Sequence, residues 1–462
     1  MHIHILGICG TFMAGIASLA RAAGHRVTGS DQGVYPPMSD QLVALGIDVI
    51  EGYAAGQLDL APDIVVIGNA LTRGMPVVEE TLNRRIPYAS GPEWLAREVL
   101  RSRRVIAVAG THGKTTTTSL LAHILESAGL NPGFLIGGVP RDFDTSARLG
   151  RGSVFVIEAD EYDTAFFDKQ AKFLHYRPEI QIITNLEFDH ADIYPDLAAI
   201  QNQFHQLVRS LPANGRLVVP AGDANIQAVL ERGCWTPVDT FASEPAAGAD
   251  WTGTASASGE FRLFEQGVSQ GAVSWGMSGD YNAENAVAAL LAARAVGVSN
   301  DAALSAIAGF GGVKRRLEQR GEFGGVRVYD DFAHHPTAIS RTIGGLRREM
   351  PEGRLAIVLE LRSNTMKLGV HKDTLAAALS AADRVWVYRP AGLDWDLAAA
   401  VQALSSVQVC DDTATIVEAA SGYVEPGDRL VVMSNGGFEN IQVRLEAALE
   451  RRFGRRAAPH SD

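Results

Sequence analysis

Short apolar runs rich in Val and Ile alternate with longer Ala- and Leu-rich stretches along almost the whole chain of 462 residues. The short runs have the length and composition of strands buried on both faces, and the longer stretches have the length of crossover helices. This alternation indicates parallel sheets covered by helices, and thus a doubly wound α/β fold class. We expect strands at 2–6, 64–67, 105–109, 154–157, 180–184, 326–329, 355–359, 384–387 and 430–433, and helices at 14–23, 115–128, 197–210, 283–295 and 439–453.

The length allows roughly three domains of about 150 residues each. A basic run, Arg101-Ser102-Arg103-Arg104, precedes one expected strand, and a Gly-rich basic stretch at 311–316 precedes another. These breaks predict domains at 1–102, 103–313 and 314–462. The segment 246–276 lacks a helical period, so we expect hairpins there, and we expect the tail 455–462 to be disordered.

The charge balance is acidic, because 41 basic and 53 acidic side chains give a formal net charge of −12. An excess of carboxylates argues against nucleic acid or an anionic membrane as the main partner, although basic residues could still gather around an anionic ligand. The sequence has no run of about 18 apolar residues, so we expect no membrane span, and it begins without a basic signal-peptide region. Three widely spaced cysteines argue against disulfides and zinc ribbons. We therefore expect a cytoplasmic location, and the sequence leaves the oligomeric state open.

The strongest motif directly follows the expected strand 105–109 and precedes an expected helix. Backbone N–H groups and a helix dipole in this position suit phosphate oxygens. Lys114 is placed to reach the β- and γ-phosphates, and the Thr115 hydroxyl is placed to ligate Mg²⁺. The full P-loop pattern would have glycine where this chain has Val108, and the alternative is a plain turn with a solvated lysine. We predict a P-loop ATPase-like middle domain whose ATP-binding loop is Gly110, Thr111, His112, Gly113, Lys114, Thr115 and Thr116.

Carboxylates follow the next expected strand, in the run 158–163. Such a run is often only a solvated loop, but carboxyl ends of parallel strands face the ligand crevice, where a metal–nucleotide needs hard oxygen ligands. Its position one crossover after the phosphate loop favours Glu158 as a ligand. His190 follows the strand 180–184 and could hold a second metal, with Asp189 orienting its ring. The candidate metal ligands are therefore Thr115, Glu158 and His190.

Two asparagines lie near the start of the expected helix 283–295. Asn282 is a plausible N-cap, and Asn285 lies three residues further on the same face. Both could therefore meet a purine edge, and the sequence leaves the cap and the adenine contact equally open.

A glycine-rich turn follows the first strand, with the spacing G-x-x-G-x-x-x-x-G from Gly7 to Gly15. This spacing suits the phosphates of a nucleotide but argues against a standard NAD site, which has G-x-G-x-x-G. Ser30 and Asp31 end the next strand, where an acid could hold a ribose hydroxyl.

In the third domain, polar clusters follow three expected strands, at 330–336, 362–367 and 434–437. Strand ends at one edge of a sheet outline a crevice. Hydrogen-bond donors dominate the last two clusters, so we expect a ligand that carries carboxylates. The alternative is that these residues only cap their own elements. The candidates are Arg362, Ser363, Asn364, Lys367, Asn435 and Gly436.

Together these segments resemble the Mur ligases, the ATP-dependent amide-forming enzymes of peptidoglycan synthesis, over the whole chain. The matching segments occur in the family's order: 110–115, 158–163, 185–190, 281–285, 315–316 and 331–336. His112, the run 158–163 and His334-His335-Pro336 resemble the branch that accepts UDP-N-acetylmuramate itself. Segments 6–13, 35–39, 68–70, 363–367 and 434–438 resemble the enzymes of that branch that add the tripeptide L-alanyl-γ-D-glutamyl-meso-diaminopimelate during cell-wall recycling.

The resemblance implies a Rossmann-like N-terminal domain that binds the UDP-sugar, a middle domain that binds ATP and Mg²⁺ or Mn²⁺, and a Rossmann-like C-terminal domain that closes over both and binds the peptide. It also implies that the acceptor carboxylate becomes an acyl phosphate, which the peptide amine attacks, with His334 or His335 as a candidate base. The implied UDP-sugar residues are Gly7, Cys9, Gly10, Thr11, Phe12, Met13, Ser30, Asp31 and Asn69. The implied catalytic residues are Lys114, Glu158, His190, Arg316 and Asp331, and the last two would join Asn282 and Asn285 in binding ATP.

Four alternative functions share part of this pattern. An L-alanine-adding ligase of the same branch differs only in its amine substrate. A P-loop phosphotransferase or NTPase explains Lys114 and Glu158 but leaves the first domain's glycine turn and the third domain's crevice without purpose. A Rossmann oxidoreductase conflicts with the glycine spacing, and folylpolyglutamate synthetases have no need of a UDP-binding domain.

Overall fold

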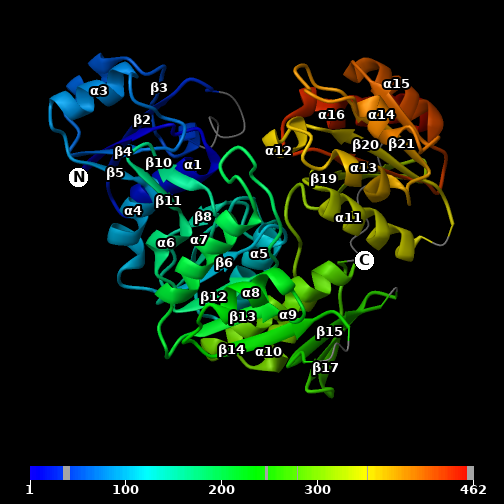
Figure 1. The fold of residues 1–462 in the computed structure, drawn as a ribbon, viewed down its shortest axis with the longest axis horizontal. Coiled ribbons are helices and arrows are strands. Elements are labelled where there is room, and N and C mark those ends of the chain that lie inside the picture. Colours follow the sequence, from blue (N-terminus) through cyan, green and yellow to red (C-terminus); the bar gives the residue numbers. More distant parts are fainter. Residues whose placement is uncertain (35–41, 245–247, 257, 278, 351, 455–462) are drawn as a thin grey trace.

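The computed structural model describes residues 1–34, 42–244, 248–256, 258–277, 279–350 and 352–454. It consists of three α/β domains, each built on one main sheet. In Figure 1 the N-terminal domain lies at the upper left, the C-terminal domain at the upper right and the middle domain below them. The three-domain α/β prediction is confirmed, whereas the boundaries at 102/103 and 313/314 stay predictions. The segments 35–39 and 455–462, singled out from the sequence, lie outside the described residues.

The N-terminal domain has a parallel five-stranded sheet in the order β3-β2-β1-β4-β5. The strand order reverses between β1 and β4, and open α/β sheets bind ligands at such a point. Helix α1 begins at Thr11, earlier than predicted, so the residues after the glycine turn form its first turn. The elements are β1 (His2–Leu6), α1 (Thr11–Ala22), β2 (Arg26–Asp31), β3 (Val49–Glu51), η1 (Ala55–Leu60), β4 (Ile64–Ile67), α3 (Pro76–Asn83), β5 (Tyr88–Ser90), α4 (Gly91–Leu95) and η2 (Ala96–Leu100).

The middle domain has a ten-stranded sheet in the order β17-β16-β15-β14-β13-β12-β6-β9-β7-β8. The predicted hairpins are confirmed, because β15, β16 and β17 pair antiparallel, and β15 joins them to the parallel part of the sheet. The strands are β6 (Arg104–Ala109), β7 (Gly133–Leu135), β8 (Ala147–Arg148), β9 (Val154–Glu158), β12 (Ile180–Ile183), β13 (Arg216–Pro220), β14 (Val238–Ala242), β15 (Trp251–Ala255), β16 (Glu260–Glu265) and β17 (Val268–Ser274). A separate hairpin pairs β10 (Asp163–Ala165) with β11 (Asp168–Ala171), and the helices are α5 (Lys114–Ser127), α6 (Phe173–Tyr176), α7 (Leu197–Ser210), α8 (Ala224–Glu231), α9 (Asp280–Ala295) and α10 (Asn300–Ala308).

The C-terminal domain has a six-stranded sheet in the order β18-β19-β23-β20-β21-β22, parallel except for β18. Its strands are β18 (Glu318–Phe323), β19 (Val326–Asp331), β20 (Leu355–Glu360), β21 (Arg384–Tyr388), β22 (Val407–Cys410) and β23 (Arg429–Met433). Its helices are α11 (Pro336–Glu349), α12 (Asn364–Lys367), α13 (Lys372–Leu379), α14 (Leu397–Val401), α15 (Thr413–Tyr423), η3 (Phe438–Asn440) and α16 (Ile441–Phe453). The last helix was predicted to begin at 439 but begins at Ile441, because Phe438, Glu439 and Asn440 have positive φ.

The apolar core ties the first two domains together. One cluster of buried side chains runs from Ile3 in β1 through Leu135 in β7 to Phe155 in β9. Gly15 of α1 makes this contact close, because a Cβ there would lie 2.2 Å from Leu135 Cδ1. Gly15, the third glycine of the turn predicted to bind phosphate, therefore allows the N-terminal and middle domains to pack closely. The C-terminal domain instead has apolar clusters of its own. The contacts that it makes with the middle domain, described below, are polar.

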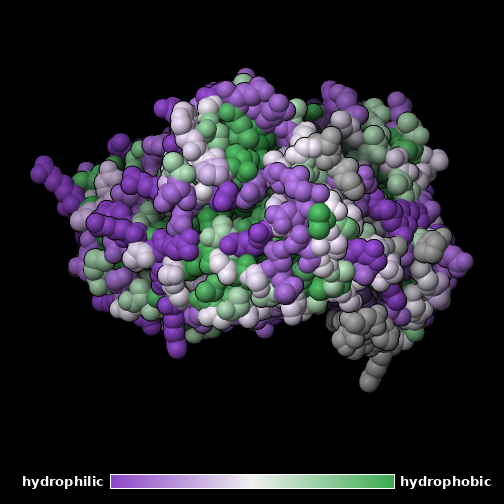
Figure 2. Space-filling view, turned by 90° about the horizontal axis from the view of Figure 1, so that it is seen from below, coloured by the Kyte–Doolittle hydropathy of each residue, from purple (hydrophilic) through white to green (hydrophobic). Residues whose placement is uncertain are grey.

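The surface has an ordinary mixed character. On the face seen in Figure 2, hydrophilic side chains are interspersed with smaller apolar areas. Across the described part of the chain, no helix is long and apolar enough to cross a membrane.

Candidate active site

One cavity of about 1130 Å³ is lined by residues of all three domains. From the predicted UDP-sugar set it is lined by Gly7, Cys9, Gly10, Thr11, Phe12, Met13, Asp31 and Asn69. From the middle domain it is lined by Thr111, His112, Gly113, Lys114, Thr115, Thr116, Glu158, His190, Asn282 and Asn285, and from the C-terminal domain by Arg316, Asp331, His334 and Asn435. Other predicted residues lie outside this lining: Ser30, Gly110, Arg362, Ser363, Asn364, Lys367 and Gly436.

Sheet register explains why distant motifs meet in this cavity. Strand β6 lies between β9 and β12, and all three are parallel. Val108 pairs with Glu158 on one side, and Ala109 pairs with Ile183 on the other. The loops after the three strands therefore emerge at the same edge of the sheet.

The phosphate loop turns sharply into helix α5. Gly113 is the N-cap with φ of 83°, and a Cβ there would lie 2.6 Å from the Asn285 side-chain oxygen. Both the left-handed conformation and this close approach require glycine. The turn brings Lys114, Thr115 and Thr116 to the cavity wall in the first turn of α5.

The segment after β12 holds the phosphate loop in place. Asn185 Oδ1 accepts a hydrogen bond from the His112 backbone N–H at 2.8 Å, and its Nδ2 donates to the His112 carbonyl at 3.0 Å. The Thr184 hydroxyl donates to the same carbonyl at 2.5 Å. This positioning role of Thr184 and Asn185 was missed from the sequence, although both stand at a strand end.

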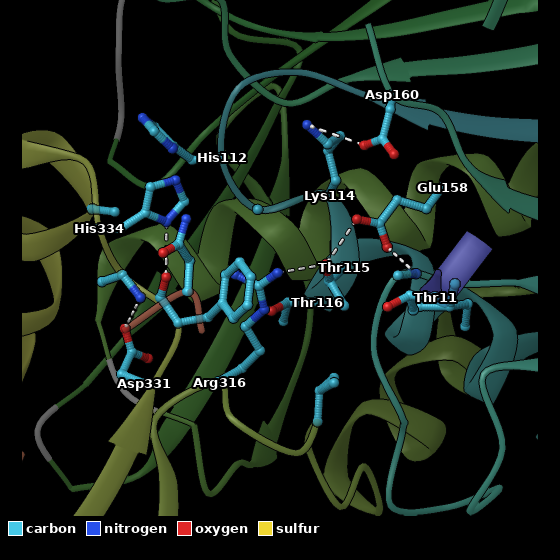
Figure 3. Close-up of a pocket in the computed structure, with 18 of the residues that line it drawn as sticks. Thr11, His112, Lys114, Thr115, Thr116, Glu158, Asp160, Arg316, Asp331 and His334 are labelled. Atoms are coloured by element: carbon cyan, nitrogen blue, oxygen red, sulfur yellow. Dashed lines mark hydrogen bonds and ion pairs between the residues drawn. The ribbon is translucent and has the colours of Figure 1, made fainter. Parts of the chain in front are cut away.

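Lys114 lies inside an acidic cluster (Figure 3). Its Nζ lies 3.2 Å from Glu161 Oε2 and 3.6 Å from Asp160 Oδ1, and it donates to the Gly110 carbonyl at 2.7 Å. Burial alone would lower the pKa of Lys114, but Glu161, Asp160 and Glu158 raise it above its usual value. Burial likewise opposes ionisation of Glu161, yet Lys114 and His190 lower the pKa of that carboxyl to about 2. The lysine is therefore charged, as a phosphate ligand must be.

Glu158 has the surroundings of a cation ligand. Its Oε1 accepts from the Thr115 hydroxyl at 2.8 Å, and its Oε2 accepts from the Gly137 N–H at 2.7 Å. Burial first, and then the Asp160 carboxylate, raise the pKa of Glu158. A divalent cation would relieve this excess of negative charge, and hydroxyl and carboxylate oxygens are the ligands that Mg²⁺ prefers. Thr115 and Glu158 therefore fit a magnesium ion.

His190 has a different partner from the one predicted. Its Nε2 lies 2.9 Å from Glu161 Oε1, so Glu161 orients the ring. Burial alone would lower the pKa of His190, but Glu161 raises it above its usual value. Asp189 was predicted to orient the ring, but its carboxylate accepts from the His190 backbone N–H and from the Thr365 hydroxyl. The prediction for Asp189 is therefore wrong, because its carboxylate accepts from the backbone of His190 while the ring of His190 faces Glu161.

The two asparagines lie on one face of α9, and both line the cavity. Asn282 was a candidate N-cap, but α9 begins at Asp280 after Gly279, so Asn282 lies inside the helix and the cap prediction is wrong. Asn285 Nδ2 donates to Asn282 Oδ1 at 3.3 Å, and its Oδ1 accepts from the Thr117 hydroxyl of α5 at 3.0 Å. The pair therefore also fixes α9 against the phosphate-loop helix.

Asp31 stabilises the glycine turn of the N-terminal domain. Its carboxylate accepts from the backbone N–H of Cys9 at 2.8 Å and of Gly33 at 3.1 Å. Tyr53, which sequence analysis missed, donates to it at 3.4 Å and also lines the cavity.

The C-terminal domain reaches the phosphate loop through Arg316. Its Nη2 donates to the Thr115 hydroxyl at 2.7 Å (Figure 3). Its guanidinium lies 4.6 Å from the Phe332 ring centroid. Asp331 accepts from the Leu317 N–H at 2.6 Å, which holds the segment that carries Arg316. Burial lowers the pKa of His334 to about 4, so this cavity-lining imidazole is neutral at neutral pH.

The residues predicted to bind peptide carboxylates are only partly available. Ser363 caps α12, and Asn364 donates to Asp192 of the middle domain at 2.8 Å. Arg362 packs directly against Gly436, because a Cβ added to Gly436 would lie 2.0 Å from Arg362 Nη1. Asn435 lines the cavity, and its Oδ1 is buried without a hydrogen-bond partner. The turn at 435–437 does not lead directly into the last helix, because η3 separates it from α16.

Known families match each domain in turn. Residues 2–103 match the Mur ligase family, catalytic domain; residues 108–293 match the Mur ligase middle domain; residues 315–436 match the Mur ligase, glutamate ligase domain. The chain belongs to the Mur ligase family, and it is therefore an ATP-dependent, amide-forming ligase.

Three relatives within the family illustrate the similarity of this chain to known ligases. The UDP-N-acetylmuramate–L-alanyl-γ-D-glutamyl-meso-2,6-diaminoheptandioate ligase of Escherichia coli K12 is 50% identical over 98% of this chain and 99% of its own length. A crystal structure of a murein peptide ligase from Psychrobacter arcticus has 45% identity and a TM-score of 0.75, over 99% of this chain and 100% of its own. A UDP-N-acetylmuramate–L-alanine ligase of Rubrobacter xylanophilus is 39% identical over 80% of each chain.

The division of metal binding between Glu158 and His190 is testable. We expect Glu158→Gln to raise the Mg²⁺ concentration for half-maximal rate by about tenfold or more, and His190→Ala to raise it less. The reason is that a hard divalent ion gains more from a charged oxygen than from an imidazole. Phosphate release measured across a Mg²⁺ titration gives the ranking. Glu179→Gln, whose carboxylate pairs with Arg104, serves as the control. The opposite ranking would contradict the assignment.

Proposed function

We propose that this chain joins the amine of L-alanyl-γ-D-glutamyl-meso-diaminopimelate to the lactyl carboxylate of UDP-N-acetylmuramate, with ATP as co-substrate, in cell-wall recycling. The observation that carries the proposal is the cavity shared by three domains, because it offers one space to a nucleotide-sugar, a nucleoside triphosphate and a third ligand. The similarity to the tripeptide-adding ligase supports the choice of amine, since it is higher and covers more of both chains than the similarity to the alanine-adding ligase. The expected cytoplasmic location stays a prediction.

The first step is transfer of the γ-phosphoryl group. An oxygen of the lactyl carboxylate attacks the γ-phosphorus, the bond to the β–γ bridging oxygen breaks, and ADP leaves. Lys114 and Arg316 supply positive charge to the transferring group from opposite domains. Thr115 and Glu158 would hold Mg²⁺, which when bound adds charge neutralisation at the phosphates.

The second step forms the amide. The peptide amine attacks the acyl carbon, phosphate leaves, and a proton passes from the nitrogen to a base. His334 is the better candidate for that base, because its imidazole lines the cavity. His335 instead caps α11 by accepting the Thr337 N–H at 3.3 Å, and it lies outside the cavity lining.

The experiment that tests the proposal compares amines. With UDP-N-acetylmuramate and ATP present, we expect kcat/KM for the tripeptide to exceed that for L-alanine by at least about a hundredfold. A site with buried polar groups for distant carboxylates leaves those groups unpaired when a small amine binds. Phosphate release and product mass give the measurement, and omission of UDP-N-acetylmuramate is the control. Equal or better use of L-alanine would overturn the tripeptide assignment.

A further inference from the structure

We propose that His112, Glu187 and His335 form a second cation site, which takes a borderline divalent ion of the Zn²⁺ or Co²⁺ type and joins the middle domain to the C-terminal domain. The proposal does not depend on which amine the enzyme uses. It concerns a cluster distinct from Thr115 and Glu158, the residues that fit Mg²⁺.

The three side chains converge on one point. Glu187 Oε2 lies 3.5 Å from His112 Nε2 and 3.7 Å from His335 Nδ1. One ligand atom from each residue lies within 4.8 Å of the other two, and within the described ranges no other His, Cys, Asp or Glu trio meets this criterion. Ligand atoms around a tetrahedral zinc ion lie about 3.4 Å apart, given bonds of about 2.1 Å. Small side-chain rotations would therefore complete the site.

The buried imidazoles of His112 and His335 have ring nitrogens that lack a partner. His335 is 5% exposed, and the Nε2 atoms of His112 and His335 are buried without a hydrogen-bond partner. Buried polar atoms in native proteins nearly always have partners, so each exception needs a reason. At His112 the unpartnered Nε2 is also the atom that faces Glu187, so a bound cation gives it such a reason. At His335 the atom that faces Glu187 is Nδ1, which would exchange the hydrogen bond from the Thr337 N–H for the cation.

The protonation states already suit a metal. Burial, with smaller contributions from His112 and His371, lowers the pKa of His335 to about 3, so its imidazole is neutral. Burial opposes ionisation of Glu187, but the nearby His112 and the hydrogen bond from the Thr337 hydroxyl lower its pKa to about 2. Neutral imidazole and ionised carboxylate are the forms that ligate metals.

The chemistry of the site separates it from a magnesium site. Two imidazoles and one carboxylate suit Zn²⁺, Co²⁺ or Ni²⁺, whereas Mg²⁺ prefers oxygen ligands throughout. His112 belongs to the phosphate loop and Glu187 follows β12, while His335 opens helix α11 of the C-terminal domain. The Thr337 hydroxyl of the C-terminal domain already donates to Glu187 Oε2 of the middle domain at 2.7 Å. A cation here would therefore favour the closed arrangement of the two domains.

The experiment titrates Co²⁺ into the full chain after EDTA treatment, without nucleotide and with excess Mg²⁺ to occupy oxygen-rich sites. We expect one equivalent of Co²⁺ to bind with a visible absorption band typical of nitrogen and oxygen ligands, and Zn²⁺ to displace it. His112→Gln and His335→Gln should each weaken binding at least about tenfold. Because ions that bind only the folded chain raise its stability, Zn²⁺ should also raise the unfolding temperature of the wild type but not of these variants.

Matched controls decide the outcome. His123→Gln removes an imidazole that faces a single carboxylate, Asp142, at 3.1 Å, and Glu158→Gln tests the magnesium ligand. Both should keep Co²⁺ binding. Circular dichroism checks folding, and His112→Gln decides the question if loss of the helix cap unfolds the His335 variant. Unchanged binding in the folded histidine variants, or loss of binding in Glu158→Gln, would overturn the proposal.

Discussion

Lys114→Met is expected to lower kcat by at least about 10³-fold, or about 4 kcal/mol of barrier. The variant removes the buried ammonium group that faces the transferring phosphoryl group and keeps most of the side-chain volume. The same change leaves Glu161, whose side chain is 3% exposed, without its lysine. Since breaking a buried ion pair costs about 3–5 kcal/mol of folding stability, we expect a lower unfolding temperature as well. Steady-state kinetics and thermal unfolding measure the two effects.

A double variant separates catalysis from stability. Glu161→Gln in the Lys114→Met background removes the uncompensated charge, so it should restore much of the unfolding temperature without restoring kcat. Lys169→Met is the single-site control, because that lysine is exposed and pairs with Asp163. Near-normal turnover of a folded Lys114→Met enzyme would show that the phosphate-loop assignment is wrong.

Arg316→Met is expected to lower kcat by about 10³-fold or more while changing the KM for ATP much less. An arginine supplied to a phosphoryl-transfer site by another domain acts mainly on the charge of the transition state. Here the guanidinium reaches from the C-terminal domain to the Thr115 hydroxyl of the middle domain. Initial rates over a range of ATP concentrations separate kcat from KM.

The control for Arg316→Met is a variant of Lys314, two residues earlier in the chain. Lys314→Met removes a positive charge that is half-exposed and pairs with Asp144, so it should keep nearly full activity. A similar loss in both variants would point to the linker itself, and a rise in KM alone would mean that Arg316 binds ATP without stabilising the transition state.

Much of the candidate site was predictable because local patterns and sheet geometry act together. Gly113, Lys114 and Thr115 stand at a strand-to-helix turn, and parallel pairing of Val108 with Glu158 then places the acidic run beside them. The caps and helix starts were less accurate. Asn282 is a good cap residue, but Gly279 three positions earlier offers the backbone geometry that starts the helix.

The sequence by itself determined the α/β class, the number of domains, the phosphate loop and the family, because these depend on periodicity and on residues close together in the chain. The tertiary structure alone decided which side chains meet. It paired His190 with Glu161, placed Arg316 on Thr115, and joined His112, Glu187 and His335 at the domain seam. The physical reason is that these contacts join residues 29 to 223 positions apart. Such contacts depend on how the sheets are ordered and how the domains pack, and no local pattern encodes this information.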